Sequence, residues 1–154
     1  MKSRGRKTVL AAGVFDLLHY GHLRFLEEAK KAGGRGARLI VVVARDKTVE
    51  ERKGAKPVLP EEQRRILVEA LKPVDEAVLG FEDFNIHEVL KIIRPDVVAV
   101  GYDQDDIYEE VKRLIDEEGF RAQLVRIGRF GDKGLGSSSD IKRRVIEEWR
   151  RPLE

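Results

Sequence analysis

Short aliphatic runs alternate with segments of helical periodicity from one end of this chain to the other. The runs expected to form strands cover residues 9–14, 39–44, 76–79, 97–100 and 122–127. The run at 39–44 is uninterrupted and rich in β-branched residues, which is typical of a strand buried on both faces of a parallel sheet. Because strands that alternate with helices are joined by right-handed crossovers, the pattern predicts an α/β fold with a doubly wound, five-stranded parallel sheet.

The segments between these runs carry apolar residues at helical spacing. They predict helices over residues 23–32, 86–93, 107–118 and 139–149, and one more that Pro60 opens and Pro73 ends. Ile66 and Leu67 belong to the apolar stripe of the Pro60 helix. We expect that stripe to be its buried face, and we expect Trp149 in the last helix to be a packing residue.

Size and composition predict a single domain over residues 1–154. Thirty basic residues nearly balance 28 acidic ones, so the net charge of +2 favours neither nucleic acid nor a membrane surface as a partner. The apolar stretches are far shorter than the roughly 20 residues that cross a bilayer, and the basic start leads into no signal-type region, which predicts a cytoplasmic protein. The absence of cysteine excludes disulfides, thiolate metal ligands and thiol catalysis.

The densest motif follows the first run, from Gly13 to His22, and reads GVFDLLHYGH. Ligands of doubly wound sheets bind beyond the carboxyl ends of strands, and a helix N-terminus there offers unpaired N–H groups to a phosphate. His19 and His22 would donate further hydrogen bonds, and Gly21 would let a phosphate chain approach the backbone. Two other interpretations are that the histidines cap and pack the helix, or that they bind a metal; no third ligand lies nearby, so no protein-held metal is predicted. Asp16 has its own alternative, a helix cap.

This motif resembles the HxGH nucleotidyltransferase superfamily, and it matches every fixed position of the G-x-F-D-x-x-H-x-G-H pattern of the cytidylyltransferase-like branch. The resemblance implies a Rossmann-like nucleotidyltransferase fold. It implies that His19 and His22 contact the triphosphate and stabilise charge on the α-phosphoryl group and the departing pyrophosphate. The nucleotide-binding positions expected with them in this motif are Gly13, Val14, Phe15 and Asp16.

A second cluster of candidates follows the second run, where a basic loop carries Lys53 and Lys56. Lysines in a loop can clamp phosphate, and we expect these two, with Asp16, to contact the second substrate; the alternative is that they are simply solvated. The resemblance puts a phosphate-binding, catalytic arginine at Arg64, which would otherwise be a surface charge paired with neighbouring glutamates. For Arg65 we expect that pairing.

The remaining candidates follow the fourth and fifth runs. Gly101 is expected at a close approach to the nucleotide, and Asp103 would hold Mg²⁺, contact a sugar or base, or merely cap the next helix. The stretch from Lys133 to Ser138 joins glycines, hydroxyls and a helix start, which makes an anion site. It resembles the Arg-x-x-Ile-Ser-Thr-Thr loop of the family, with Lys133 in place of arginine and Ser137 and Ser138 in place of threonines. A serine N-cap without a ligand is the alternative.

Over nearly the whole chain, the sequence is most similar to archaeal FAD synthases. The resemblance rests on segments such as 43–46, 56–65, 69–75, 94–104 and 137–141. It implies transfer of AMP from ATP to FMN with release of pyrophosphate, with Mg²⁺ or another divalent cation delivered with the triphosphate, and it favours a homodimer. A CTP-dependent cytidylyltransferase acting on glycerol 3-phosphate or a related phospho-alcohol, and a non-catalytic nucleotide-binding protein, are the other hypotheses.

Overall fold

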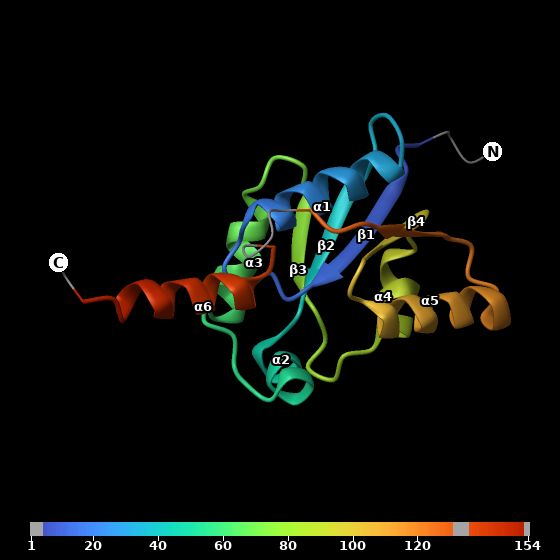
Figure 1. Cartoon of the computed structure of the whole chain (residues 1–154). Coiled ribbons are helices and arrows are strands. Elements are labelled where there is room, and N and C mark those ends of the chain that lie inside the picture. The colour runs from blue at the N-terminus through green and yellow to red at the C-terminus, as the bar shows by residue number, and fades with distance from the viewer. Residues whose placement is uncertain (1–4, 131–135, 153–154) are drawn as a thin grey trace.

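A computed structural model of the chain describes residues 5–130 and 136–152. Its strands form one parallel sheet of five, in the order β3-β2-β1-β4-β5. They are β1 (Thr8–Gly13), β2 (Arg38–Val43), β3 (Glu76–Leu79), β4 (Val97–Gly101) and β5 (Gln123–Ile127). The chain runs outward from β1 to β3 and then returns to the other side of β1, so the doubly wound α/β sheet is confirmed and its order reverses between β1 and β4 (Figure 1).

Helices cover both faces of this sheet. They are α1 (Tyr20–Ala32), α2 (Asp46–Lys53), α3 (Glu61–Glu69), α4 (Ile86–Ile93), α5 (Asp105–Glu118) and α6 (Ser138–Trp149). Alternate residues of the strands point to opposite faces, so each strand contributes to two cores. Val9, Leu39 and Val41 pack with α1 and α3 on one face. Leu10 and Val98 pack with α4 and α5 on the other.

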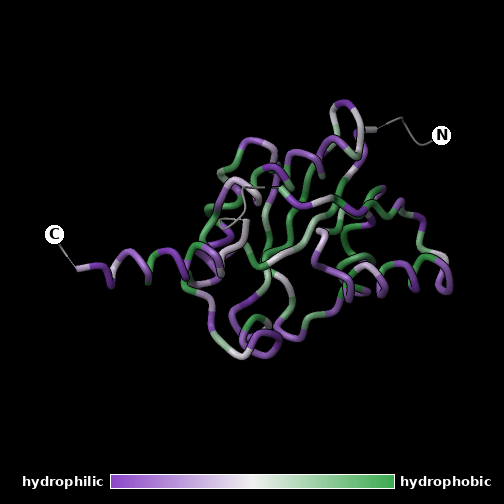
Figure 2. Tube along the Cα trace, viewed as in Figure 1, coloured by the Kyte–Doolittle hydropathy of each residue, from purple (hydrophilic) through white to green (hydrophobic). Residues whose placement is uncertain are grey.

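The central strands are apolar throughout because both faces are covered. In Figure 2 the hydrophobic segments gather in the middle of the molecule, and the surrounding helices alternate in hydropathy. The residues of β4 are all buried, as are four of the six in β1 and five of the six in β2. Among the residues that the structure describes, no helix is long and apolar enough to span a membrane.

One helix departs from the sequence-based prediction. Residues 46–53 form α2, so Arg52 and Lys53, expected in a basic loop, lie in the last turn of a helix. This helix has no continuous apolar face, because Thr48 and Val49 are its buried residues. It ends at Gly54, whose φ of 74° is a left-handed conformation that glycine adopts without strain. The periodicity of the segment therefore could not reveal it.

Two predicted packing faces are also wrong. In α3 the buried side chains are Arg64 and Val68, whereas Ile66 and Leu67 of the expected stripe are 52% and 44% exposed. In α6 no described residue is buried, and Trp149 is 88% exposed. Figure 1 shows the reason for the second result, since α6 extends away from the sheet toward the C-terminus. A helix that lies beside the sheet only at its first turn cannot bury its far end.

Candidate active site

A cavity of about 670 Å³ lies beyond the carboxyl ends of the strands, where the order of the sheet reverses. Its wall is built from the loop after β1, the helix α2, residues just after β3, β4 and β5, and the start of α6. Figure 1 shows α2 beyond the strand ends and α6 beside them. The predicted candidates in the wall are Gly13, Val14, Phe15, Asp16, His19, His22, Lys53, Lys56, Gly101, Asp103, Ser137 and Ser138. Lys133 lies outside the described residues.

The loop between β1 and α1 follows a strained path. Phe15 and Leu17 have φ angles of 54° and 46°, in the left-handed region that bulky residues avoid, at a cost of roughly 1 kcal/mol or more each. The ring of Phe15 is buried against Gly13, where a Cβ atom would come within 2.8 Å of the ring. The packing of that ring therefore stabilises the turn, and the turn brings the next residues to the cavity.

The two histidines of the loop complete a reciprocal cap at the start of α1. The backbone N–H of Gly21 donates to His19 Nδ1 at 3.0 Å, and the backbone N–H of His19 donates to His22 Nδ1 at 3.3 Å. Because each Nδ1 accepts a hydrogen bond, the proton of each neutral ring is on Nε2. The capping role considered for these histidines is thus present, and it leaves one N–H donor on each ring for a ligand.

Burial and mutual proximity keep these rings uncharged. Burial lowers the pKa of His22 to about 4, with the neighbouring His19 and Lys53 acting in the same direction and Asp16 acting against them. Burial also lowers the pKa of His19, although Asp140 opposes the shift. The ring centroids are 3.9 Å apart, so adding a proton to one ring disfavours a proton on the other. Near neutral pH both are hydrogen-bond donors rather than cations.

The structure gives a reason for Gly21 in addition to the expected approach of a phosphate chain. A Cβ atom there would lie 2.7 Å from the carbonyl oxygen of Phe130 and 2.8 Å from Cε1 of His19. The glycine therefore leaves room for the chain after β5 and for the first histidine. Gly21 also lines the cavity.

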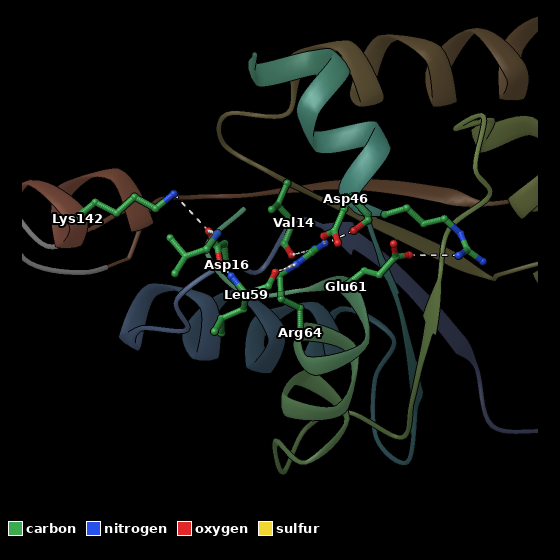
Figure 3. A network of polar contacts seen from close by, with 10 residues as sticks. Val14, Asp16, Asp46, Leu59, Glu61, Arg64 and Lys142 are labelled. Carbon is green, nitrogen blue, oxygen red and sulfur yellow. Dashed lines mark hydrogen bonds and ion pairs between the residues drawn. The ribbon is translucent and has the colours of Figure 1, made fainter. Parts of the chain in front are cut away.

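Asp16 is not a helix cap, since His19 holds that position for α1. Its carboxylate accepts from the backbone N–H groups of Val58 and Leu59, at 2.8 and 3.0 Å, and it pairs with Lys142 at 3.2 Å. Burial alone would raise the pKa of Asp16, but these three partners outweigh it and hold that pKa below its ordinary value. Asp16 is thus an ionised anchor that ties residues 58–59 and α6 to the cavity wall (Figure 3).

Arg64 does not line the cavity. Its side chain is completely buried, and its guanidinium donates to the carbonyl oxygens of Leu59, Val14 and Ala44 and to Asp46 Oδ1, at 2.7 to 2.9 Å. Figure 3 shows these groups converging on it from several segments. In this structure the guanidinium of Arg64 therefore contacts other protein groups in place of the expected phosphate. With this many protein partners, it holds the loops together.

The other arginine of this helix behaves as predicted. Arg65 pairs with Glu62 at 2.7 Å and with Glu69 at 3.4 Å, on its own helix. Arg64 is completely buried and the adjacent Arg65 is partly exposed, because successive helical residues point about 100° apart.

At the end of β4, a glutamine joins the two strands that flank the reversal point. Gln104 accepts from the backbone N–H of Gly101 at 2.8 Å and donates to the carbonyl oxygen of Ala12 at 2.9 Å. A Cβ atom on Gly101 would lie 3.3 Å from side-chain oxygens of Asp103 and Gln104, so the backbone is close to its neighbours here. The residue preceding α5 is Gln104, not Asp103, and the exposed Asp103 lines the cavity. Its helix-cap alternative is therefore excluded.

The start of α6 closes the remaining side of the cavity. Ser137 is the N-cap of this helix, and its hydroxyl accepts from the N–H of Asp140 at 3.2 Å. The hydroxyl of Ser138 donates to the carbonyl oxygen of Asp16. Lys142, one turn further on, lines the cavity and was missed by sequence analysis. The signal that could have identified it is a cation one helical turn after the serine loop.

Together these segments form a site for a polyanion. Two helix N-termini, those of α1 and α6, border one cavity with two neutral histidine donors and the cations Lys53, Lys56 and Lys142. Unpaired N–H groups at helix starts and ammonium groups both bind phosphate oxygens. The arrangement can hold a chain of phosphates against donors that need not change their protonation state.

Comparison with known proteins agrees with this geometry. The family model described as cytidylyltransferase-like matches residues 10–144. The FAD synthase of Methanopyrus kandleri is 50% identical, covering 94% of this chain and 95% of that protein; the FAD synthase of Ferroglobus placidus is 49% identical, covering 91% and 88%. A solved structure described as a lipopolysaccharide core biosynthesis protein from Thermoplasma volcanium has a TM-score of 0.74 at 38% identity, covering 82% of this chain and all of that one. The pantoate-beta-alanine ligase of Francisella tularensis, at 15% identity with a TM-score of 0.66 and coverage of 97% and 74%, shares the fold.

Proposed function

The chain belongs to the cytidylyltransferase-like family and is a nucleotidyltransferase similar to the archaeal FAD synthases; from this we propose that it transfers AMP from ATP to FMN, giving FAD and pyrophosphate. The observation that carries the proposal is the convergence of the His19–His22 cap, the α6 N-terminus and the lysines on one cavity. These donors suit a nucleoside triphosphate together with the phosphate of a second substrate.

The chemistry needs no protein nucleophile. The phosphate of FMN is already ionised, and one of its oxygens attacks the α-phosphorus of ATP in line while the bond to the pyrophosphate breaks. The Nε2–H groups of His19 and His22 donate to phosphate oxygens on which negative charge increases, and donors fixed in place in this way lower the barrier. The low pKa of His22 means that this ring meets the substrate as a neutral donor.

A divalent cation accompanies nucleoside triphosphates in this family, and we take it to be Mg²⁺. Its contribution is to neutralise phosphate charge. The carboxylates of the cavity suit a cation that arrives bound to the nucleotide. The carboxylate of Asp16 already accepts from Val58 and Leu59 and pairs with Lys142. Asp103 lies exposed in the cavity wall. Asp103 is the protein oxygen donor that would meet such a cation or a sugar hydroxyl.

The acceptor phosphate is held by Lys53 and Lys56 in this proposal. Both line the cavity, Lys53 from the last turn of α2 and Lys56 from the segment after it. Asp16 acts on this contact indirectly, because it fixes the segment at 58–59 that follows Lys56.

The test is a substrate panel with purified protein and Mg²⁺. ATP with FMN should yield FAD and pyrophosphate in equal amounts, measured by chromatography and by a phosphatase-coupled pyrophosphate assay. ATP with riboflavin, which lacks the attacking phosphate, is the matched control and should give neither product. Product from CTP with glycerol 3-phosphate would instead identify the cytidylyltransferase, and no product with any pair would contradict both activities.

A further inference from the structure

The cavity has a second end of different character, on the α4 and α5 face of the sheet. Its wall there contains Val42, Val49, Phe84 and Ile107. Val42 points into the core shared with α4 and α5, and Phe84 and Ile107 pack against that core. The histidines instead lie at the start of α1, which packs on the opposite face. The cavity thus passes across the strand ends from a polar side to an apolar one.

One residue in the wall of this end has an enclosed hydroxyl without a partner among the described residues. Thr48 is 5% exposed and lines the cavity, and its hydroxyl has no hydrogen-bond partner among the residues that the structure describes. Buried hydroxyls are normally paired, because an unpaired hydroxyl loses its hydrogen bonds to water and gains none within the protein. A ligand with both an apolar surface and a hydrogen-bonding edge would satisfy it.

The side of this end is a flat layer that joins two helices. The guanidinium carbon of Arg52 lies 4.7 Å from the centroid of the Phe84 ring, and Arg52 Nη1 lies 3.0 Å from Asp106 Oδ2 on α5. An arginine stacked on an aromatic ring presents a planar, polarisable surface. All three residues line the cavity, so the layer is accessible to a ligand.

We propose that this end binds the isoalloxazine ring of FMN, and that Thr48 is the residue that selects it; the inference rests on the proposed function. The flavin ring has an apolar dimethylbenzene edge and a pyrimidine edge with one N–H and two carbonyl groups. The valines and Phe84 suit the first. The hydroxyl of Thr48, which can donate and accept, suits the second.

The division of the cavity explains why the flavin and not the adenine is placed here. The donors suited to a triphosphate lie at the other end, at the N-termini of α1 and α6. The ribityl phosphate of FMN has to reach from its ring to the α-phosphate of ATP, so its ring lies on the far side of the reaction point. A phospho-alcohol without a ring would leave Thr48 unpaired, which disfavours it as an acceptor.

The decisive variant is Thr48→Val, which keeps the side-chain shape and removes the hydroxyl. We expect the Kd for FMN, measured by quenching of flavin fluorescence, to rise about tenfold, as for loss of one buried hydrogen bond. The Kd for ATP should stay within about twofold. Thr8→Val is the matched control, because Thr8 begins β1 at the opposite end of the sheet, and it should alter neither.

A second measurement keeps the test valid if the Thr48→Val protein does not fold. Lumiflavin has the ring without the phosphate, and with the wild-type protein it should compete with FMN and leave ATP binding unchanged. Competition of lumiflavin with ATP, or an unchanged FMN affinity in folded Thr48→Val, overturns the inference while FAD formation by the wild type still stands. A wild type that makes no FAD and binds no FMN overturns the proposed function as well.

Discussion

The two ends of the cavity differ in how their polar groups are used. At the α1 and α6 end, hydrogen bonds within the protein orient the two histidine rings. Each histidine accepts a hydrogen bond on Nδ1, so its Nε2–H is the donor that remains for a ligand. At the α2 end, the hydroxyl of Thr48 has no partner among the residues that the structure describes, and the wall combines apolar side chains with the Arg52–Asp106 ion pair. The first end suits charge that changes during a reaction, and the second suits a large neutral ring.

One buried residue connects these ends. Arg64 bonds to Val14 in the histidine loop, to Ala44 and Asp46 at the start of α2, and to Leu59 in the following segment. The same segment is held by Asp16. The two ends of the cavity are therefore held in place by the same hydrogen bonds of Arg64 and Asp16. Some substitutions should affect both ends, and others should affect only one.

Replacing Arg64 should have the largest effect and should damage both ends together. In Arg64→Met, three carbonyl oxygens and Asp46 lose a buried charged partner, and we expect the free energy of unfolding to fall by about 3 to 5 kcal/mol. Chemical denaturation measures this. Arg65→Met is the control, with an expected loss below about 1 kcal/mol, because its pairs lie on the helix surface. Equal losses in the two variants would disprove the structural role of Arg64.

Replacing a histidine should act on the polar end alone. Asparagine places an acceptor near the position of Nδ1 and removes Nε2–H, so His19→Asn and His22→Asn keep the helix cap and lose the outward donor. We expect kcat to fall about 10²- to 10³-fold in each, as for loss of one fixed donor to a developing charge. The Kd for FMN should change little. Steady-state kinetics with binding assays would separate these, and a full kcat would remove that histidine from the reaction.

The low pKa of His22 predicts how stability depends on pH. The unfolded histidine binds a proton near pH 6.5 and the folded one only near pH 4, so between these values the unfolded state holds more protons. The free energy of unfolding should therefore be fully retained above about pH 6.5 and decrease as the pH falls toward 4. Urea denaturation at pH 7 and pH 5 measures it. His22→Asn should show a smaller decrease than the wild type, and identical pH profiles would contradict the assignment.

Lys142 should give the smallest effect. In Lys142→Met, Asp16 keeps its two backbone N–H partners, and the lost ion pair is partly exposed, so the unfolding free energy should change by less than about 1 kcal/mol. The KM for ATP should rise severalfold because a cation leaves the polar end. Arg144→Met, further along α6 and outside the cavity wall, should leave KM unchanged. An unaltered KM in Lys142→Met would remove that residue from nucleotide binding.

The sheet was predictable because its signal is local. The expected strands agree with the observed ones to within one residue at each end, since aliphatic runs buried on both faces carry their own pattern. Two of the failures share a physical cause, because α2 and α3 are not held by apolar stripes, whereas Trp149 is exposed because α6 extends away from the sheet. Arg64, expected as a phosphate ligand or a surface charge, instead forms a buried polar network, and Asp46 of α2 is one of its partners.

The site was predictable to the level of its loops. The family resemblance identified segments that do line one cavity, because each follows a strand at the same edge of the sheet. The partners of Asp16 at Val58 and Lys142 lie 42 and 126 residues further along the chain, and no local pattern encodes them. Thr48 and Phe84 look like ordinary helix and loop residues in the sequence; the stacking on Arg52 distinguishes Phe84, and a place in the cavity wall distinguishes Thr48.

The position of β1 in the middle of the sheet has a consequence for how the protein is made. This strand pairs with β2 on one side and with β4 on the other, where Val9 faces Val97. A chain that emerges N-terminus first can pair β1 with β2 early, yet the second edge of β1 waits until β4 has been synthesised. The cavity lies at that late junction and also needs the start of α6, so catalytic competence should appear only after α6 has been made.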